Sequence, residues 1–305
     1  MHENTPTFSV IVPTYNRPDA LRNCLESFTR LDYPAGAWEL IVVNDGGETS
    51  FTGLADHLAQ NLPLQLLTVP HNGPAAARNA GARQASGELL AFTDDDCQVT
   101  PDWLRVFARG FADGHWHALG GCSRTPFQQN RAEFAWQHLT DFLYSFMQDE
   151  DGNALLLISN NVAYRRDVFH KMGGFNESFP LAAAEDLELS YRMLVSGYRQ
   201  RLLPEAIVWH YHRLTTWGHL KQQFRYGRGG YHFEQVLLER PSRKLRPLYL
   251  HEAFYSTLRR SMRRARLPHS VRGLVMVAQG AYKAGLHYQK WRNGISQLST
   301  SCRIG

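Results

Sequence analysis

The sequence predicts an α/β protein built on a mixed, mostly parallel sheet that is flanked by helices. Three observations lead to this prediction. Strand-like runs alternate with helix-like runs, a polar turn follows each strand-like run, and the apolar runs are short and continuous, as in strands buried on both faces. With 305 residues, 43% hydrophobic and 20% charged, the chain can form one large or two small domains.

The first third of the chain repeats a unit of strand, turn and helix. The strand-like runs cover residues 8–13, 38–43, 64–69 and 89–93. Apolar residues at helical spacing follow Pro18, and a helix of small residues follows Gly73-Pro74. Because the side chains of this second helix are small, we expect it to lie close to the sheet.

The pattern becomes less regular after residue 100. We expect a helix from Pro101, a strand that ends at Gly120-Gly121, an aromatic-rich helix that contains Phe134 and Phe146, and a strand at 158–166. Further along, we expect a helix from Glu185, a strand at 207–212 and a helix at 215–226 that ends before Gly227.

One stretch carries the strongest chemical signal. The apolar strand Leu89–Thr93 runs directly into three carboxylates, Asp94, Asp95 and Asp96. Adjacent anions repel one another unless a cation compensates them, and hard ions such as Mg²⁺ and Mn²⁺ take oxygen ligands. An isolated triplet could equally be a solvated acidic turn, but ligands in open α/β sheets bind at the carboxyl ends of strands. We therefore expect a metal site here.

Two other strand ends carry groups that suit a nucleotide. Thr14 and Tyr15 follow the first strand, and Asp45 follows the second. A tyrosine can stack on a base and a carboxylate can accept hydrogen bonds from base or ribose, although each alone is more typical of an exposed loop. No Gly-x-Gly-x-x-Gly follows the first strand, which disfavours a Rossmann dehydrogenase.

Four segments in this order resemble the family 2 glycosyltransferases, namely residues 9–17, 41–46, 73–81 and 92–96. The resemblance covers about the first 230 residues. It implies the Rossmann-like GT-A fold, with a nucleotide-sugar half over about 1–120 and an acceptor half over about 121–230. It also implies an inverting transferase that uses a nucleoside-diphosphate sugar, with a UDP-sugar as the expected donor, in cell-surface glycan or polysaccharide assembly.

The resemblance also implies roles for single residues. The residues that it places around the nucleotide are Pro13, Thr14, Tyr15, Arg17, Asp45, Arg78, Asp94 and Asp95. Asp94 and Asp96 match the family's Asp-x-Asp motif, for which the expected ion is Mn²⁺ or Mg²⁺. The chain departs from many members at Gly47, where they carry serine, and the third aspartate leaves the register of the metal ligands open.

A second acidic pair, Glu185-Asp186, opens a helix whose apolar face includes Leu187 and Tyr191. From spacing alone the pair could simply cap the helix, because the helix dipole stabilises negative charge in the first turn. The resemblance instead implies that Asp186 is the general base of the transfer and that Glu185 supports it.

Two histidines, His210 and His212, alternate at the end of the strand at 207–212 and so share one face. A neutral imidazole can bind a metal, although single histidines are more often structural. Because many members of the family have a histidine near this point, both are candidate metal ligands.

Residues 231–305 are expected to form a basic helical extension. Residues 240–272 contain ten Lys or Arg and one acid, Glu252, with interleaved apolar residues typical of amphipathic helices. The expected partners are an anionic membrane surface for this segment and a glycan or lipid-linked acceptor for the enzyme. No nucleic-acid partner is expected, although clustered arginines also suit nucleic acid, and a solvated appendage is the simplest alternative.

The composition also bears on location. The sequence has neither a run of about 18 uncharged apolar residues nor the pattern of a signal peptide, and its four cysteines are scattered, as in proteins of reducing compartments. We expect a cytoplasmic protein that is peripheral at the inner face of the cell membrane. The functional alternative is a non-catalytic protein of the same fold that binds nucleotide sugars or polyanions.

Overall fold

The computed structural model describes residues 5–47, 51, 53, 59–149, 152–179, 183–239 and 252–301. The chain divides into two compact units. The first unit comprises Met1–Pro126, Leu143–Glu177 and Asp186–His212, and the second comprises Phe127–Phe142, Ser178–Glu185 and Arg213–Gly305. The predicted functional boundary near residue 230, and the division into donor and acceptor halves, stay predictions.

The first unit is built on one eight-stranded sheet. Its strands are β1 (Phe8–Thr14), β2 (Trp38–Asn44), β3 (Leu64–Thr68), β4 (Leu89–Thr93), β5 (Cys97–Val99), β6 (Ala118–Arg124), β7 (Asn161–Arg165) and β8 (Gln200–His210). The order across the sheet is β3-β2-β1-β4-β7-β6-β8-β5. Strands β1 to β4 run parallel, as do β6 and β8, whereas β7 is antiparallel to both of its neighbours and β5 is antiparallel to β8. The predicted mixed sheet is confirmed.

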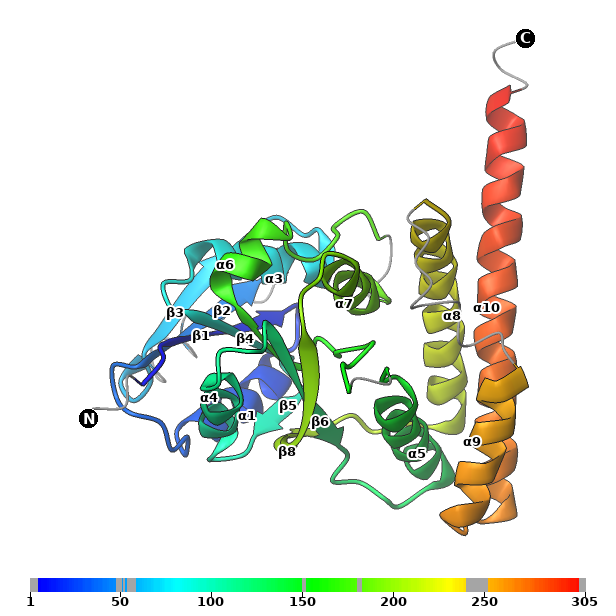
Figure 1. The fold of residues 1–305 in the computed structure, drawn as a ribbon, viewed down its shortest axis with the longest axis horizontal. Helices are drawn as coiled ribbons and strands as arrows, with labels where there is room; N and C mark the ends of the chain where they lie inside the picture. The colour runs from blue at the N-terminus through cyan, green and yellow to red at the C-terminus, as the bar shows by residue number, and fades with distance from the viewer. Residues whose placement is uncertain are drawn as a thin grey trace. The chain divides into compact units, whose positions relative to one another are not determined.

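Helices cover both faces of this sheet (Figure 1). Helices α1 (Pro18–Phe28) and α4 (Trp103–Phe111) pack on one face, and α3 (Gly73–Gln84), α6 (Arg166–Lys171) and α7 (Glu185–Val195) pack on the other. Alternate residues of β1 point to opposite faces of the sheet. Val10 and Val12 pack in the core under α1, and Ile11 packs in the core under α3. This explains why the three consecutive residues Val10, Ile11 and Val12 are all apolar.

The expectation that small residues bring α3 close to the sheet is also met. All of its residues from Ala75 to Ala82 are buried. A Cβ atom added at Gly81 would lie 2.6 Å from the side chain of Ile11, so a larger residue would push the helix off β1.

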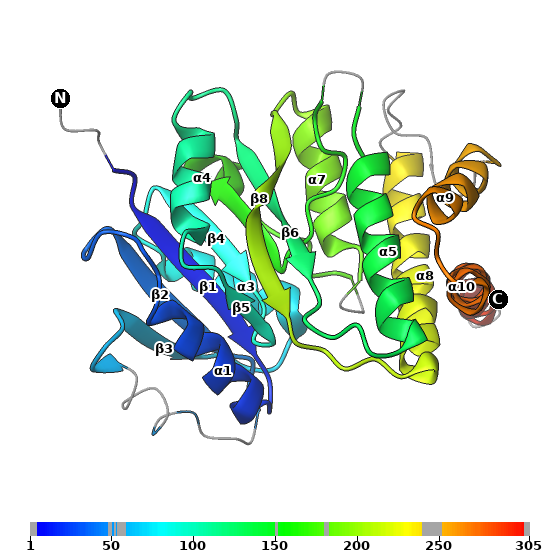
Figure 2. The same cartoon turned by 90° about the horizontal axis from the view of Figure 1, so that it is seen from below.

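The second unit is helical. It contains most of α5 (Arg131–Phe146), together with α8 (Thr216–Glu239), α9 (Glu252–Arg264) and α10 (His269–Ser301). Helices α8 and α10 lie side by side in both views (Figures 1 and 2), and α9 packs on α5, where the rings of Phe142 and Phe254 are 5.3 Å apart. The predicted helical extension is thus present in the described residues, whereas residues 240–251 of the basic segment lie outside them.

The sequence-based end of α8 at Tyr226 is wrong, because the helix continues through the following glycines to Glu239. These glycines allow α10 to approach. A Cβ atom at Gly227 would lie 1.8 Å from the carbonyl oxygen of Tyr282, and one at Gly230 would lie 2.2 Å from the Tyr282 hydroxyl. The gain in helix packing offsets the low helix propensity of glycine. Of the helices in the described ranges, none combines the length and the apolar character needed to cross a bilayer.

Candidate active site

The polar residues that follow β1, β4 and β8 meet at one edge of the sheet. Strands β1 and β4 are parallel neighbours, so the residues after Thr14 and after Thr93 leave the sheet at the same end. Strand β5 follows the aspartate triplet and pairs with β8, which brings Cys97 opposite His210. The topology therefore collects side chains that are far apart in the sequence.

The first two aspartates of the triplet bind different partners. Arg78, which is buried, donates from Nη2 to Oδ1 of Asp94 at 2.6 Å. Asp95 points into the protein, where it accepts a hydrogen bond from the Thr14 hydroxyl at 2.8 Å and one from Nη1 of Arg17 at 2.7 Å. Burial raises the pKa of Asp95 to about 7, and the charge of Arg17 opposes this shift.

The third aspartate lies next to a histidine. Oδ1 of Asp96 is 3.1 Å from Nε2 of His210, and Oδ2 accepts from Nη2 of Arg17 at 2.7 Å. Burial acts to raise the pKa of Asp96, but the hydrogen bond with His210 and the charge of Arg17 outweigh it and hold the pKa well below its usual range. Asp96 is therefore ionised at neutral pH.

The fit of this cluster to a divalent ion can be judged from its donor atoms. Within the described ranges, Asp96, Cys97 and His210 place ligand atoms within 4.8 Å of one another. Burial raises the pKa of the Cys97 thiol well above its usual value, so Cys97 stays protonated and is a poor ligand for a hard ion. The remaining pair of a carboxylate oxygen and an imidazole nitrogen suits Mn²⁺. The ring of His212 lies 3.9 Å from that of His210.

An aromatic shelf, formed by the rings of Tyr15 and His71, lies beside the carboxylate of Asp45. The two rings are stacked, with centroids 4.3 Å apart and planes at 21°. Nδ1 of His71 is 2.8 Å from Oδ2 of Asp45, and the two oxygens of Asp45 also accept the backbone N–H groups of Asn72 and Gly73 at 3.0 Å. These contacts fix a buried carboxylate next to an exposed aromatic surface.

His71 was missed in the sequence analysis. It lies two residues before the start of α3, in a loop after β3 where no periodic pattern marks it. The signal that could have identified it is its place directly before Asn72-Gly73, at the same sheet edge as Tyr15.

Asp186 lies in the first turn of α7, and its carboxylate accepts two backbone hydrogen bonds. The N–H of Ser159 donates to Oδ2 at 3.2 Å, and the N–H of Leu187 donates to Oδ1 at 2.8 Å. Burial raises the pKa of Asp186, and these two hydrogen bonds and the charge of Arg78 act in the opposite direction. The carboxyl group is thus better able to take up a proton than an ordinary aspartate.

The backbone is unusual at two points beside these residues. Asn16, between Tyr15 and Arg17, has a φ of 53°, and Ala184 has a φ of 73°. Non-glycine residues in this region are uncommon, and such strain is concentrated at functional sites.

The other predicted residues are distributed as follows. Pro13 lies within β1, so its backbone is part of the sheet edge. Glu185 is buried and belongs to the second unit, whereas Asp186 belongs to the first.

A family model and the similar proteins all point to the same family. The model of the family described as "Glycosyl transferase family 2" matches residues 9–173. Glycosyltransferase AglE of Haloferax volcanii is 28% identical over 233 residues, which cover 75% of this chain and 74% of that protein. An N-acetylglucosaminyltransferase of Sinorhizobium fredii is 28% identical over 239 residues, covering 73% of this chain and 57% of that protein. The probable glycosyltransferase YdaM of Bacillus subtilis is 25% identical over 262 residues, covering 82% and 61%.

Solved structures show the same fold. Mannosyltransferase PcManGT from Pyrobaculum calidifontis, in complex with GDP-Man and Mn²⁺, aligns with a TM-score of 0.69 at 19% identity and covers 95% of this chain and 88% of that chain. S. aureus TarS 1–349 in complex with UDP-GlcNAc aligns with a TM-score of 0.53 at 17% identity and covers 94% and 92%. At these identities the likeness concerns the fold. The predicted GT-A architecture is therefore confirmed.

Proposed function

This chain belongs to glycosyl transferase family 2, and we propose that it moves a sugar from a nucleoside-diphosphate sugar to an acceptor hydroxyl with inversion of the anomeric configuration. The observation that carries the proposal is that one sheet edge has an ionised carboxylate beside a histidine, Asp96 and His210, in the same compact unit as Asp186 with its raised pKa. The alternative of a non-catalytic binding protein is not favoured by any feature of the described residues.

The aromatic shelf of Tyr15 and His71 supports a nucleotide donor. An exposed ring pair offers a flat apolar surface on which a base can stack. The fixed carboxylate of Asp45 keeps His71 in place. PcManGT and TarS were solved with GDP-Man and UDP-GlcNAc, both nucleoside-diphosphate sugars. We propose a donor of this class, with a UDP-sugar as the expected member.

A divalent ion would be held by Asp96 and His210, with Asp94 as the neighbouring carboxylate. When bound, the ion neutralises charge on the departing diphosphate. Of the two expected ions, Mn²⁺ accepts an imidazole ligand more readily than Mg²⁺. Asp95 is the least suited of the three aspartates, because its oxygens already bind Thr14 and Arg17. A role of His212 as a further ligand stays a prediction.

Asp186 would act as the general base. The oxygen of the acceptor hydroxyl forms a bond to the anomeric carbon, the bond from that carbon to the diphosphate oxygen breaks, and the hydroxyl proton moves to the Asp186 carboxylate. The raised pKa of Asp186 supports this role, because a base works best when its pKa approaches the working pH. Glu185 stays a candidate for orienting the base or the acceptor.

The acceptor and the location are also part of the proposal. We propose a glycan or a lipid-linked acceptor in cell-surface glycan assembly, reached at the cytoplasmic face of the membrane. The support is the basic character of α9, which has four arginines and one acid.

A panel of nucleotide sugars tests this function. Each donor is incubated with the protein and Mn²⁺, and release of the nucleoside diphosphate is measured with and without a chelator. We expect hydrolysis of one donor class that the chelator abolishes, and Asp96→Ala should remove the dependence on Mn²⁺. Cys97→Ala is the matched control, because Cys97 is adjacent but protonated. Hydrolysis that is equal with and without the chelator would contradict the role of the ion.

A further inference from the structure

Helices α9 and α10 line a pocket of about 460 Å³ in the second unit. The residues of this pocket that matter here are Tyr255, Ser256 and Arg259 of α9 and Gln279, Gly280 and Lys283 of α10. Each set follows helical spacing, so each lies on one helix face. Seams between packed helices are usually apolar, whereas most of the side chains that line this one carry a polar or charged group.

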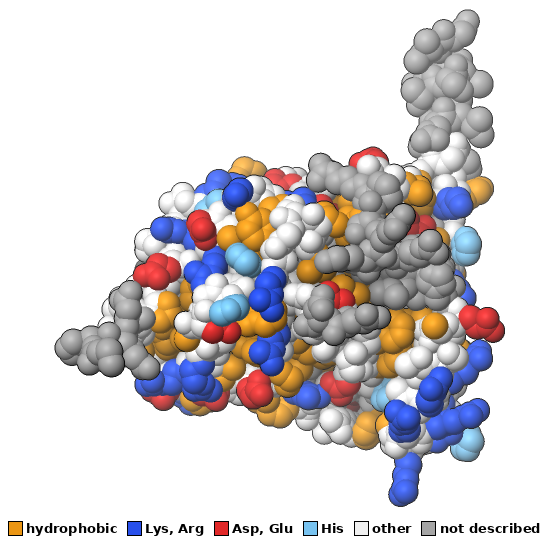
Figure 3. All heavy atoms as spheres, in the orientation of Figure 1, with side chains coloured by type: hydrophobic (Ala, Val, Ile, Leu, Met, Phe, Trp, Pro, Cys, Tyr) orange, Lys and Arg blue, Asp and Glu red, His pale blue; other side chains and the backbone are white. Residues whose placement is uncertain are grey.

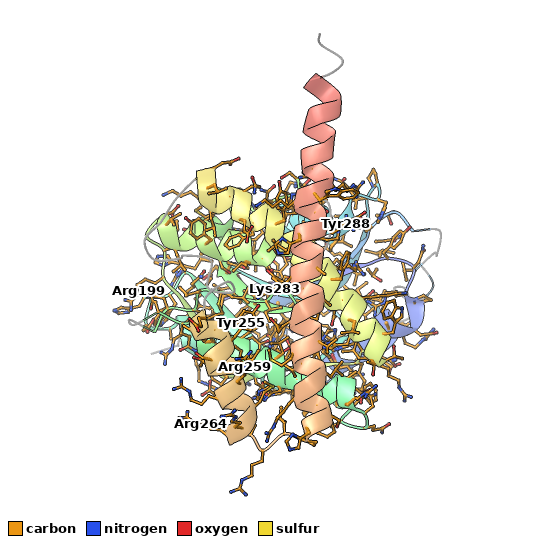
Figure 4. The ribbon with its side chains drawn as sticks, turned by 90° about the vertical axis from the view of Figure 1, so that its right-hand side faces the viewer. Arg199, Tyr255, Arg259, Arg264, Lys283 and Tyr288 are labelled. Carbon is orange, nitrogen blue, oxygen red and sulfur yellow. The ribbon has the colours of Figure 1, made fainter. Side chains whose placement is uncertain are left out.

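The charges of the pocket favour an anion. Arg259 and Lys283 are its two cations, and Glu252 is the acid that lines it. Nζ of Lys283 lies 4.3 Å from the ring centroid of Tyr255. Figure 4 shows Tyr255 and Arg259 on α9 and Lys283 on α10 gathered along the same seam. An anionic group of the right size would therefore meet two positive charges.

A hydrogen-bond donor in the pocket also lacks an acceptor. The hydroxyl oxygen of Tyr255 is buried and has no hydrogen-bond partner among the described residues. Burial raises the pKa of Tyr255, so the hydroxyl remains protonated and is a donor. Buried polar groups in folded proteins are nearly always paired, and a phosphate oxygen would supply the missing acceptor.

The residues around the pocket indicate which kind of molecule would carry the phosphate group. Helix α10 contains no acidic residue, and α9 carries exposed arginines at 259, 260, 263 and 264. Figure 3 shows basic side chains gathered in the region where Figure 1 draws α9. Val277, next to the pocket residue Met276, is 57% exposed. Exposed basic residues beside exposed apolar ones are typical of helices that lie on a membrane surface.

We propose that this pocket binds the phosphate group of an anionic membrane lipid. Arg259 and Lys283 pair with the phosphate, Tyr255 donates to one of its oxygens, and Gly280 leaves the space that the headgroup occupies. The inference rests on the membrane partner in the proposed function and adds to it a specific headgroup site, in place of diffuse attraction alone.

The first test fills the pocket without changing charge. A Cβ atom added at Gly280 or at Gly273 meets nothing within 4 Å, so both positions of α10 accept a leucine. Binding of the full chain is measured by co-sedimentation with phosphatidylcholine vesicles that contain phosphatidic acid. We expect Gly280→Leu to weaken binding about fivefold, the effect of losing roughly one basic contact with the surface, and Gly273→Leu to leave it unchanged. Equal binding by the two variants would overturn the proposal.

The second test separates a site from diffuse attraction. Lys283→Gln and Lys290→Gln remove the same charge from exposed positions of α10. If the pocket binds the phosphate, Lys283→Gln should weaken vesicle binding more than Lys290→Gln does. Tyr255→Phe should also weaken vesicle binding. An equal loss of vesicle binding in the two lysine variants would contradict the proposed phosphate site. Melting temperatures of all variants establish that they fold.

Two further measurements show whether the phosphate group belongs to a lipid, to a small soluble molecule or to RNA. Calorimetry with glycerol 3-phosphate reports the soluble ligand, and binding of this compound without any binding to vesicles would exclude the lipid. Stronger binding to RNA than to vesicles at matched salt would also overturn the proposal. Vesicle binding is measured without nucleotide sugar, so an active transferase that ignores vesicles contradicts this inference alone.

Discussion

The guanidinium group of Arg17 binds the carboxylate of Asp96, with Nη2 2.7 Å from Oδ2. Its other amino group lies 2.7 Å from Asp95, so one arginine compensates two of the three adjacent aspartates. The Arg17 side chain is 48% exposed, whereas Asp95 and Asp96 are buried or nearly so. Arg17 therefore binds one oxygen of Asp96, Oδ2, and its positive charge lies next to the carboxylate that would hold a divalent ion.

Replacing Arg17 should strengthen metal binding. In Arg17→Gln the competing charge is lost, and we expect the affinity for Mn²⁺ to rise about fivefold, since a partly exposed ion pair contributes about 1 kcal/mol. Electron paramagnetic resonance of free Mn²⁺ measures this without any substrate. Arg22→Gln on the exposed face of α1 is the control, and a lower affinity in Arg17→Gln would show that Arg17 does not compete with the ion.

The aromatic shelf should determine nucleotide affinity. His71→Ala removes the ring that stacks on Tyr15, and we expect the affinity for a nucleoside diphosphate to fall by about threefold to tenfold, in line with about 0.5–1.5 kcal/mol for an aromatic pair. His71→Phe keeps the stack and loses the contact with Asp45, so it should retain most of the affinity. Calorimetry checks both variants. If His71→Ala binds as tightly as the wild type, the shelf does not hold the base.

Buried His219 should make the free energy of unfolding depend on pH. It is fully buried in α8, and neither ring nitrogen has a hydrogen-bond partner among the residues that the structure describes. Burial lowers the pKa of His219 to about 4, below the usual 6.5. Between these values the unfolded chain binds a proton and the folded chain does not, so the free energy of unfolding falls as the pH drops.

The expected loss from this group is about 3 kcal/mol between pH 7 and pH 4. Denaturant unfolding at both pH values measures it, and His219→Leu should reduce the difference, whereas replacement of the exposed His269 should not. The same pH dependence in wild type and His219→Leu would assign the acid sensitivity to other groups.

Much of the fold could be predicted because it depends on local pattern. The strands that end at Thr14, Asn44 and Thr93 are apolar runs closed by polar turns, and each is present. Strand β5 was missed because it has three residues and is defined by its pairing with β8. The end of α8 was misplaced because glycine favours termination locally, and only the contact with α10 shows why the helix continues.

The site could be predicted as a set of residues but not as a set of contacts. The aspartate triplet follows a strand and is visible in the sequence. Its partners are not visible in the sequence, because Arg17 and Asp96 are 79 residues apart and only the fold brings them into contact. The different environments of Asp94, Asp95 and Asp96 follow from three-dimensional packing, which no spacing rule contains.

The central claim is that Asp186 takes the acceptor proton. Its raised pKa implies that the acid limb of the pH–rate profile lies above the ordinary pKa of an aspartate, because only the ionised carboxylate can act as a base. Asp186→Asn keeps the shape of the side chain and an acceptor oxygen for one of the two N–H groups, that of Ser159 or that of Leu187.

The most direct test measures turnover of the donor and its dissociation constant in Asp186→Asn, with Glu185→Gln as the neighbouring control. We predict that Asp186→Asn lowers turnover by ~10²-fold or more and leaves donor binding nearly unchanged, because the lost interaction belongs to the transition state. Glu185→Gln should lower turnover by less. Near-normal turnover in Asp186→Asn, or a loss that is explained by weaker donor binding, would contradict the account.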